Sequence, residues 1–417
     1  MPTFTTLGAA VALAAAIVLI FRKVPPVYAL FLGALAGGLC GGGGLEPTVK
    51  AMVSGAQGMM PAVLRILASG VLAGALVKTG SAERMASGVV GALGERFALA
   101  AIALATALVC ATGVFVDISV ITVAPVALAV GRRANLPVPA ILLAMTGGGK
   151  AGNIVSPNPN TIAVAESFGC DLTSLMAANA APAICALAAA ILLAGLLGRR
   201  EGGKAAAQAE APPADLPPAW AAWTGPATVV ALLSLRPLLG VAVDPLVALP
   251  AGGIASVLAA RKWRDTVEIA SFGLGKVAGV ALLLVGTGTI AGIIKDSSLT
   301  GDTVALLEAC RMPAFLLAPL SGVLMAGATA STTAGATVAS QSFSAALLNA
   351  GVPALSAAAM IHAGATVVDS LPHGSFFHAT GGVVFMPLKE RMRLIPWEAA
   401  VGLCSTLVSM ATYLAKA

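Results

Sequence analysis

Residues 146–161 read TGGGKAGNIVSPNPNT, and residues 362–378 read HAGATVVDSLPHGSFFH. Each stretch interrupts a long apolar run, 138–168 in the first case and 354–384 in the second, with glycine, proline and polar residues. Glycine and proline weaken or end a helix, and a broken helix leaves backbone groups without partners. In a bilayer those groups must be satisfied by protein or by a water-filled cavity. The two runs therefore predict two broken helices with polar loops at membrane depth.

The composition of the chain predicts a membrane protein. Of its 417 residues, 58% are hydrophobic and 10% are charged, whereas a soluble domain has roughly 25% charged residues. The 47 glycines suit close packing of helices in lipid, where small residues let backbones approach each other. We therefore expect an all-α polytopic fold in a bacterial inner (cytoplasmic) membrane.

Charge and cysteine usage exclude other classes. The net charge of +6 comes from Lys and Arg between the apolar runs, without the basic face or aromatic platform of a nucleic-acid-binding protein. The six cysteines lack the spacing of a metal site, so we predict neither a metal nor a cofactor. The first apolar run, Leu7–Phe21, precedes Arg22 and Lys23. A secretory signal has its cations before the apolar core, so we expect an uncleaved first helix.

The apolar runs fall into two sets. Residues 199–218, RREGGKAAAQAEAPPADLPP, separate them and predict a cytoplasmic linker. The first set, in residues 1–198, comprises Leu7–Phe21, Val27–Cys40, Met59–Val77, Phe97–Val130, Val138–Phe168 and Leu175–Leu197. The second set, in residues 219–417, comprises Ala227–Leu239, Leu246–Ala260, Val277–Ile294, Phe315–Leu348, Ala354–Val384 and Pro396–Leu414.

The two sets resemble each other and indicate an internal duplication. Ala73 precedes a glycine as Ala291 does, at an offset of 291 − 73 = 218 residues, and Phe97 and Phe315 open the next runs at the same offset. Spans of roughly 20 residues give about five crossings in each half, or about ten transmembrane helices. Because an odd number of crossings inverts the second half, we predict two inverted repeats.

Each half also contains an earlier interruption. Residues 110–119 read CATGVFVDIS, and residues 327–342 read GATASTTAGATVASQS. Their glycines and polar residues lie in the middle of apolar runs and favour a turn there. We therefore predict two re-entrant hairpins, at 97–131 and 315–349.

The basic residues predict the orientation, because Lys and Arg concentrate in cytoplasmic loops. This rule makes the N-terminus periplasmic. Arg65 and Arg236 fall inside apolar runs, and we expect them to face other helices or to reach the interface without a specific role. The predicted cytoplasmic clusters are Arg22/Lys23, Lys78/Arg84/Arg96, Arg132/Arg133, Arg199/Arg200/Lys204, Arg261/Lys262/Arg264 and Lys389/Arg391/Arg393.

Broken helices at matched positions of two halves are typical of the central site of a secondary transporter. Helix N-termini there offer N–H groups to an anion, so we expect a small organic anion to bind between the hairpin tips and the broken-helix loops. The candidate substrate-binding residues are Asp117, Ser119, Asn153, Ser156, Asn158, Asn160, Thr161, Ser331, Thr332, Thr333, Ser370 and His373.

Titratable residues at these interruptions predict coupling to protons. Asp117, Asp369 and His373 are the candidate proton carriers, since an acid inside an apolar run is costly without a function and imidazole titrates near neutral pH. A structural hydrogen-bond role is the alternative for the two acids. Lys150 could attract a carboxylate or extend to the interface. Sodium coupling through hairpin carbonyls and hydroxyls is the alternative. An ion channel is less favoured because channels use symmetric rings, and an enzyme because no nucleophile with its base is evident.

Three stretches carry a family resemblance: VDISVITVAPVALAVGRR, NIVSPNPNTIAVAESFGCDLTSLM and VVDSLPHGSFFHATGGVVFMPLKERMRLIPWEA. With them the chain resembles the gluconate permease (GntP) family of the ion transporter superfamily. The resemblance implies proton-coupled symport of a sugar acid or short hydroxy acid, such as gluconate or 3-hydroxybutyrate. It also implies a homodimer, with a scaffold and a transport domain of two hairpins and two broken helices that moves as an elevator.

Overall fold

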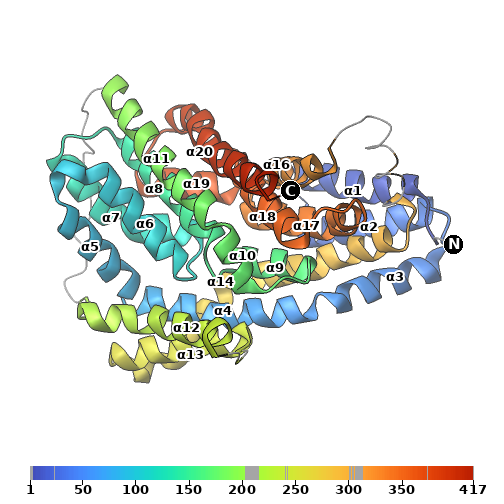
Figure 1. Ribbon diagram of the computed structural model, residues 1–417, viewed down its shortest axis with the longest axis horizontal. Helices are drawn as coiled ribbons and strands as arrows, with labels where there is room; N and C mark the ends of the chain where they lie inside the picture. Colours follow the sequence, from blue (N-terminus) through green and yellow to red (C-terminus); the bar gives the residue numbers. More distant parts are fainter. Residues whose placement is uncertain are drawn as a thin grey trace.

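The computed structural model describes residues 3–22, 24–201, 216–239, 241, 243–299, 302, 305, 313–372 and 374–416. These residues form α-helices and short 3₁₀ helices (Figure 1), which confirms the all-α prediction. The helices of the first half are α1 (Thr6–Phe21), α2 (Pro26–Cys40), α3 (Leu45–Gly58), α4 (Met60–Lys78), α5 (Ser81–Leu93), η1 (Glu95–Phe97), α6 (Ala98–Ala111), α7 (Val116–Arg133), α8 (Val138–Ile154), α9 (Pro159–Ser167), α10 (Leu172–Ala178) and α11 (Ala180–Glu201).

The second half follows a similar order of elements. Each half begins with two short apolar helices, continues with a long helical segment, and then has a helical hairpin, an interrupted helix and a final long helix. The helices of the second half are α12 (Ala219–Leu239), α13 (Pro245–Ala259), η2 (Trp263–Asp265), α14 (Thr266–Lys295), η3 (Ala314–Leu316), α16 (Leu317–Thr329), α17 (Thr332–Asn349), α18 (Ala354–Gly364), α19 (Ser375–Val383) and α20 (Leu388–Leu414).

The interruptions lie inside the runs in which the sequence predicts them. Helix α8 ends at Ile154 and α9 begins at Pro159, where proline suits the first turn of a helix because its missing N–H is not needed there. Asn158 precedes that proline and caps α9, since its side chain accepts hydrogen bonds from the N–H groups of Asn160 and Thr161. In the second half the gap between α18 and α19 is longer, from residue 365 to residue 374.

The helices pack into two groups that meet along α4 and α14 (Figure 1). The long-helix group contains α1–α4 and α12–α14, and α4 packs along both α13 and α14 in it. The hairpin group contains α6–α11 and α16–α20, and α8 packs against α6 and α11 in it. Helix α5 contacts both groups. Contacts between the two groups include those of α14 with α17, of α4 with α9 and of α1 with α16.

Glycines bring the long helices into backbone contact. A Cβ atom on Gly55 would lie 2.1 Å from the carbonyl oxygen of Gly288, and one on Gly273 would lie 2.0 Å from that of Gly70. Only a residue without a side chain permits so close an approach. The glycines of the two contacts correspond to each other at one offset: Gly288 corresponds to Gly70, since 288 − 70 = 218, and Gly273 corresponds to Gly55, since 273 − 55 = 218. The same contact therefore occurs twice, with the roles of the two halves exchanged.

Helix length and composition identify a multi-pass membrane protein. Among the described residues, four helical segments are long and apolar enough to cross a bilayer, namely Met60–Lys78, Ala180–Arg200, Trp263–Lys295 and Leu388–Leu414. The segment formed by α5 and α6, bent by 105°, would be a fifth span. Helices α6 and α16 have 14 and 13 residues. Each is therefore about 20 Å long, which is shorter than the bilayer's hydrocarbon core of about 30 Å. The count of about ten crossings stays a prediction.

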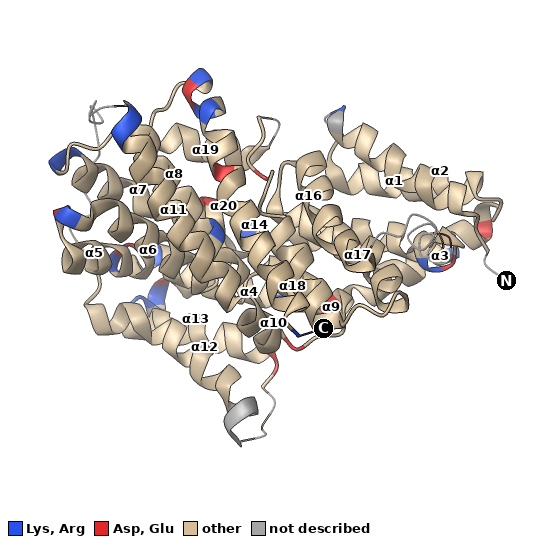
Figure 2. Cartoon of the chain, turned by 45° about the horizontal axis from the view of Figure 1, so that its top comes forward, with Lys and Arg blue, Asp and Glu red and all other residues tan. Residues whose placement is uncertain are grey.

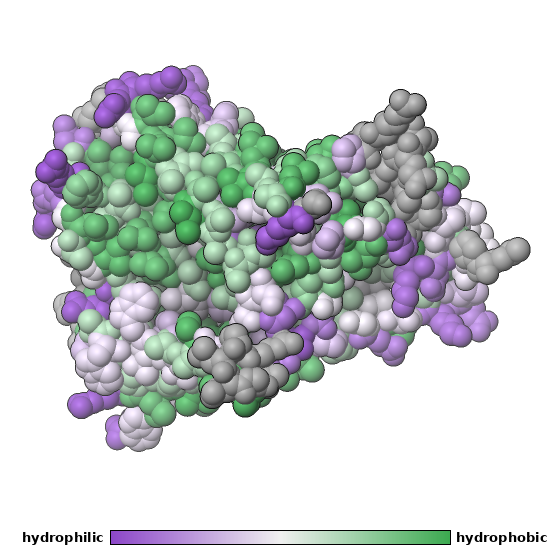
Figure 3. Space-filling model, in the orientation of Figure 1, coloured by the Kyte–Doolittle hydropathy of each residue, from purple (hydrophilic) through white to green (hydrophobic). Residues whose placement is uncertain are grey.

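The surface fits a bilayer as solvent. Large apolar side chains on the outer helices are exposed, for example Ile184 and Leu192 of α11 and Leu407 of α20. Figure 3 shows a broad apolar surface over the part of the molecule that contains α6, α7 and α11, with polar residues at its margins. Figure 2 shows that many Lys and Arg residues gather at one end of the molecule, beside α5 and α7.

Candidate functional site

A cavity of about 550 Å³ lies where the two groups of helices meet. The long-helix group contributes the start of α2 and part of α14 to its wall, and the hairpin group contributes both hairpin tips and parts of both interrupted helices. The polar and charged side chains of its wall include Asp117 beside the first tip, Ser331, Thr332 and Thr333 at the second tip, Asn160 of α9, Asp369 of the second break, and Lys276 of α14.

The first hairpin turns at residues 112–115 and brings Asp117 to the cavity. Gly113 has a φ of 109°, a backbone conformation that glycine adopts readily and that other residues avoid. Asp117 lies in the first turn of α7 and is half-buried. A carboxylate is stabilised at a helix N-terminus, but an unpaired acid there also repels an anion. Its protonation state therefore bears directly on what the cavity can bind.

The second hairpin tip is tied to the second break by an acid. Thr332 Oγ1 donates a hydrogen bond to Asp369 Oδ2 at 2.5 Å, and Ser370 Oγ donates to Asp369 Oδ1 at 3.2 Å. Asp369 Oδ1 also lies 2.6 Å from Lys150 Nζ, and both side chains are at most 3% exposed. The carboxylate is thus charge-compensated inside the protein.

Lys150 joins three segments in the interior. Besides its ion pair with Asp369, Lys150 Nζ donates to the carbonyl oxygens of Thr366, at 2.6 Å, and of Glu398, at 3.3 Å. Of the two interpretations of Lys150, the structure therefore supports attraction of a carboxylate, and that carboxylate belongs to the protein itself.

A second buried ion pair lies next to the first. Arg391 Nη1 is 3.0 Å from Glu398 Oε1, and both side chains are 1% exposed. The guanidinium also donates to the Phe377 carbonyl oxygen and to Thr380 Oγ1, at 3.3 and 3.2 Å. The sequence interpretation assigned Arg391 to a basic loop cluster, whereas the structure places it in the interior, where it holds α19 against α20.

The first break is organised by three asparagines. Asn153 Oδ1 accepts hydrogen bonds from Asn158 Nδ2 at 2.6 Å and from Asn160 Nδ2 at 2.9 Å. Ser156 Oγ donates to the Cys110 carbonyl oxygen at 2.7 Å, which ties the break to the first hairpin. Within the described residues, Asn153 Nδ2 and Asn160 Oδ1 are buried and have no hydrogen-bond partner. Such groups are costly, and the Asn160 amide belongs to a residue that lines the cavity.

The predicted site residues divide into a cavity wall and the layer behind it. Asp117, Asn160, Ser331, Thr332, Thr333 and Asp369 line the cavity. Ser119, Asn153, Ser156, Asn158, Thr161 and Ser370 are buried outside the lining set, where they bond to backbone and to neighbouring side chains. His373 lies outside the described residues.

Sequence reasoning missed Lys276. Among the described residues that line the cavity, it is the only cation. It lies on α14, next to an apolar run. A lysine in that position usually extends to the lipid interface, so the sequence does not mark it as a site residue. Its Nζ lies 5.2 Å from the centre of the Phe272 ring, a cation–π contact. Only the packing of α14 against the hairpin tips brings it to the site.

Comparisons with known proteins agree with this arrangement. Residues 4–217 match the sequence model of the GntP family permease. The chain is 52% identical to an uncharacterised transporter of Haemophilus influenzae over 412 residues, 98% of each chain. It is 27% identical to an uncharacterised permease of that organism over 173 residues, 41% of this chain and 35% of the other.

A solved structure is similar to most of the fold. The YdaH transporter of Alcanivorax borkumensis superposes with a TM-score of 0.65 over 88% of each chain, at 16% sequence identity. Together with an all-helical membrane fold, the family match over half of the chain and the 52% identical transporter make the class clear. The chain belongs to the GntP family of permeases and is a membrane transporter, not an enzyme.

Proposed function

We propose that this permease is a secondary active transporter that carries a small organic anion together with protons by an elevator-type movement. The observation that carries the proposal is the cavity of about 550 Å³ at which both hairpin tips, both interrupted helices and α14 converge. Cavities of about 300–1,000 Å³ suit small-molecule ligands. A gluconate-like sugar acid or short hydroxy acid fits the mixture of hydroxyl, amide and charged groups in its wall.

The two groups of helices support the elevator. The hairpin group supplies most of the cavity wall, and the long-helix group supplies one side of it. We infer two inverted repeats, 1–198 and 219–417, from the two glycine contacts that share an offset of 218 residues. Inverted repeats can exchange conformations, which yields an inward-facing and an outward-facing state. The hairpin group is accordingly the moving part, and the long-helix group is the scaffold.

The anion is bound by Lys276 and by the start of α17. Ser331 caps α17, and its Oγ accepts a hydrogen bond from the Ala334 N–H at 3.3 Å. The first N–H groups of a helix have no partner within the helix and attract anions. Lys276 of α14 adds a formal positive charge to the wall of the same cavity. The hydroxyls of Thr332 and Thr333 and the amide of Asn160 are available for the hydroxyl groups of the substrate.

Asp117 is the proposed proton carrier. While Asp117 is charged, it offsets the charge of Lys276, which lines the same cavity. Protonation of Asp117 removes that offset and leaves Lys276 to the carboxylate of the substrate, so that proton and anion bind together. Asp369 is compensated by Lys150 without any ligand, and we assign it the task of holding the second hairpin tip through Thr332. Basic residues at one end of the molecule (Figure 2) support cytoplasmic basic loops and a periplasmic N-terminus.

Uptake into proteoliposomes tests the proposal. A radiolabelled panel of gluconate, glycerate, lactate, 3-hydroxybutyrate and citrate is offered with an inward proton gradient and, separately, with an inward sodium gradient. We expect accumulation of at least one monoanion with protons alone. Accumulation with sodium alone would replace proton coupling by sodium coupling at the hairpin tips. Failure of both gradients to drive uptake of any acid would contradict an organic-anion symporter.

Replacing Lys276 by glutamine is expected to weaken anion binding. Loss of one hydrogen bond from a charged group should raise KM for the transported acid by about tenfold to hundredfold, with a smaller change in the maximal rate. The matched control is Lys50→Gln, because Lys50 is exposed on α3 and does not line the cavity. Initial rates over a range of substrate concentrations separate the two parameters. An unchanged KM would remove Lys276 from the binding site.

A further inference from the structure

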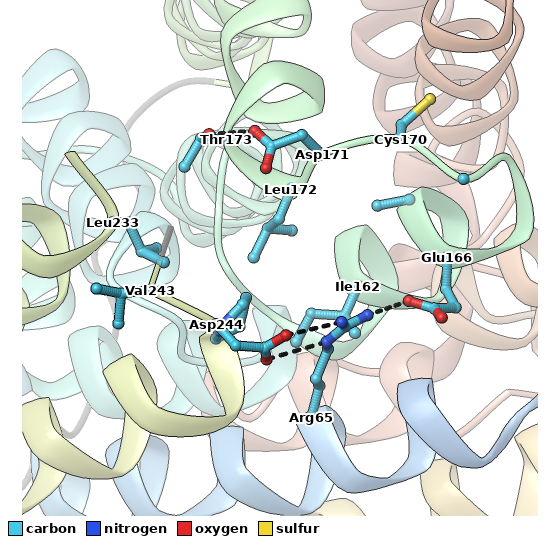
Figure 4. A pocket seen from close by; sticks show the side chains of 13 residues that line it. Arg65, Ile162, Glu166, Cys170, Asp171, Leu172, Thr173, Leu233, Val243 and Asp244 are labelled. Carbon is cyan, nitrogen blue, oxygen red and sulfur yellow. Dashed lines mark hydrogen bonds and ion pairs between the residues drawn. The ribbon is translucent and has the colours of Figure 1, made fainter. Parts of the chain in front are cut away.

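A second cavity, of about 390 Å³, has Arg65 of α4 in its wall, and this charged side chain extends across it (Figure 4). Its wall contains Arg65 of α4, Asp244 at the start of α13, Glu166 near the end of α9, and the loop that leads to α10. Figure 4 shows Arg65 extending between Asp244 and Glu166. The sequence predicts no specific role for this arginine, whereas the structure shows it in contact with two carboxylates.

Arg65 binds both carboxylates at once. Its Nε and Nη2 donate to the two oxygens of Asp244, at 3.1 and 2.8 Å, and its Nη1 donates to Glu166 Oε2. The hydrogen bond from Arg65 holds the pKa of the Asp244 carboxyl below its usual range. Asp244 is therefore charged at neutral pH, and its contact with Arg65 persists there. A guanidinium suits this task because its donors form a rigid planar fork.

The two contacts differ in what they join. Asp244 and Arg65 both belong to the long-helix group, so their contact lies within the scaffold. Glu166 belongs to α9, an element of the hairpin group, so its contact with Arg65 crosses the interface along which we infer movement. Asp244 thus orients the arginine, and Glu166 is the partner from the moving part.

This cavity corresponds by the repeat offset to the cavity of about 550 Å³ at the hairpin tips, the proposed substrate cavity. Pro245 opens α13 as Pro26 opens α2, at an offset of 245 − 26 = 219, and each lines one of the two cavities. Arg65 corresponds to Leu283 of α14, at 283 − 65 = 218, and Leu283 lines the substrate cavity. The second cavity is therefore built from the counterparts of the scaffold elements that face the substrate site.

We propose that the second cavity is the access route of the opposite transport state, and that the Arg65–Glu166 contact is the latch that holds the hairpin group in its present position. This inference rests on the proposed elevator, since the hairpin group must pass Arg65 to expose the site on that side. Leucine at position 283 cannot form an equivalent ion pair. The latch therefore favours one of the two states that the repeats would otherwise make equivalent.

The native Cys170 provides a test that needs neither a substrate nor an ion gradient. Cys170 is a free, partly buried cysteine in the wall of this cavity, and burial raises the pKa of its thiol. N-Ethylmaleimide is added to native membranes, and labelling is followed residue by residue by peptide mass spectrometry. Opening of the latch by Arg65→Gln should speed the labelling of Cys170 by about fivefold, the upper range for a partly exposed ion pair.

Three further variants separate movement from local electrostatics. If electrostatics alone acted, Arg65→Gln would slow labelling, because loss of a nearby cation disfavours the reactive thiolate, and Glu166→Gln would speed it, because loss of an anion favours the thiolate. If the latch opens, both variants should speed labelling. Arg65→Lys, which keeps one charge, and Asp244→Asn, which keeps the contact across the interface, should change the rate by less than about twofold. The exposed Cys40 should react at one rate in all variants, and the buried Cys110 should stay unlabelled unless the protein unfolds.

The outcomes are distinct from those of the uptake assay. Slower labelling in Arg65→Gln together with faster labelling in Glu166→Gln would reduce the effect to electrostatics and overturn the latch. Unchanged labelling in both variants would overturn it as well. Faster labelling in both would support the latch even if the proton gradient drove no uptake, because only the choice of substrate or ion would then be wrong.

Discussion

Replacing Lys150 by methionine is expected to lower the free energy of unfolding by about 3–5 kcal/mol, the cost of leaving one charge of a buried ion pair without its partner. The Lys150 and Asp369 side chains are 1% and 3% exposed, and their charged atoms lie 2.6 Å apart. Methionine is a flexible apolar residue of similar length, so the variant leaves little empty volume. The decrease in the free energy of unfolding therefore measures mainly the lost charge and hydrogen bonds. Thr332 and Ser370 would still donate to Asp369, but two hydroxyls do not neutralise a carboxylate.

The unfolding temperature of detergent-solubilised protein, followed by size-exclusion chromatography after heating, measures this effect. Lys50→Met is the control, because Lys50 is exposed and a surface change should shift stability by less than about 0.5 kcal/mol. The double variant Lys150→Met/Asp369→Asn should be more stable than Lys150→Met alone, since it leaves no lone buried charge. Equal unfolding temperatures for Lys150→Met and the unaltered protein would show that the pair contributes nothing to stability.

Local sequence predicts the helical interruptions well, because helix breakers act where they stand. Pro157, Asn158 and Pro159 end one helix and cap the next whatever packs around them. Gly113 and the polar residues near Ser331 likewise mark the two hairpin tips. Once hairpins and breaks are located, their meeting at one cavity follows from the common order of elements in the two halves. The residues that line this cavity were therefore partly predictable.

Charge pairing was not predictable in the same way, because it depends on contacts between distant segments. Lys150 and Asp369 are 369 − 150 = 219 residues apart, and nothing local links them. Arg391 and Glu398 are seven residues apart on α20, a spacing that also fits the exposed face of a helix. Lys276 and Arg65 each sit in or beside an apolar run, where an interfacial role is the ordinary interpretation. Only the packing of the two groups distinguishes these cases.

Replacing Asp117 by asparagine should abolish proton-driven accumulation while leaving exchange of bound substrate intact. Asparagine has nearly the shape of a protonated aspartate but cannot release a proton. If Asp117 carries the coupling proton, the variant resembles the protonated carrier permanently, with Lys276 free to pair with the anion in the shared cavity. Accumulation under an inward proton gradient should fall to the level reached without a gradient, because no titrating group would then couple the anion to protons. Exchange of labelled for unlabelled acid should continue.

Comparison of gradient-driven uptake with exchange in the same proteoliposomes separates coupling from binding. Asp265→Asn is the matched control, because Asp265 is exposed in η2 and lies away from the cavity. Loss of both activities in Asp117→Asn would make Asp117 a binding or structural residue rather than the proton carrier. Persistent proton-driven accumulation would exclude Asp117 from coupling. Of the other two predicted carriers, Asp369 is already neutralised by Lys150. His373 would then be the remaining candidate, and His373→Gln would be the variant to measure.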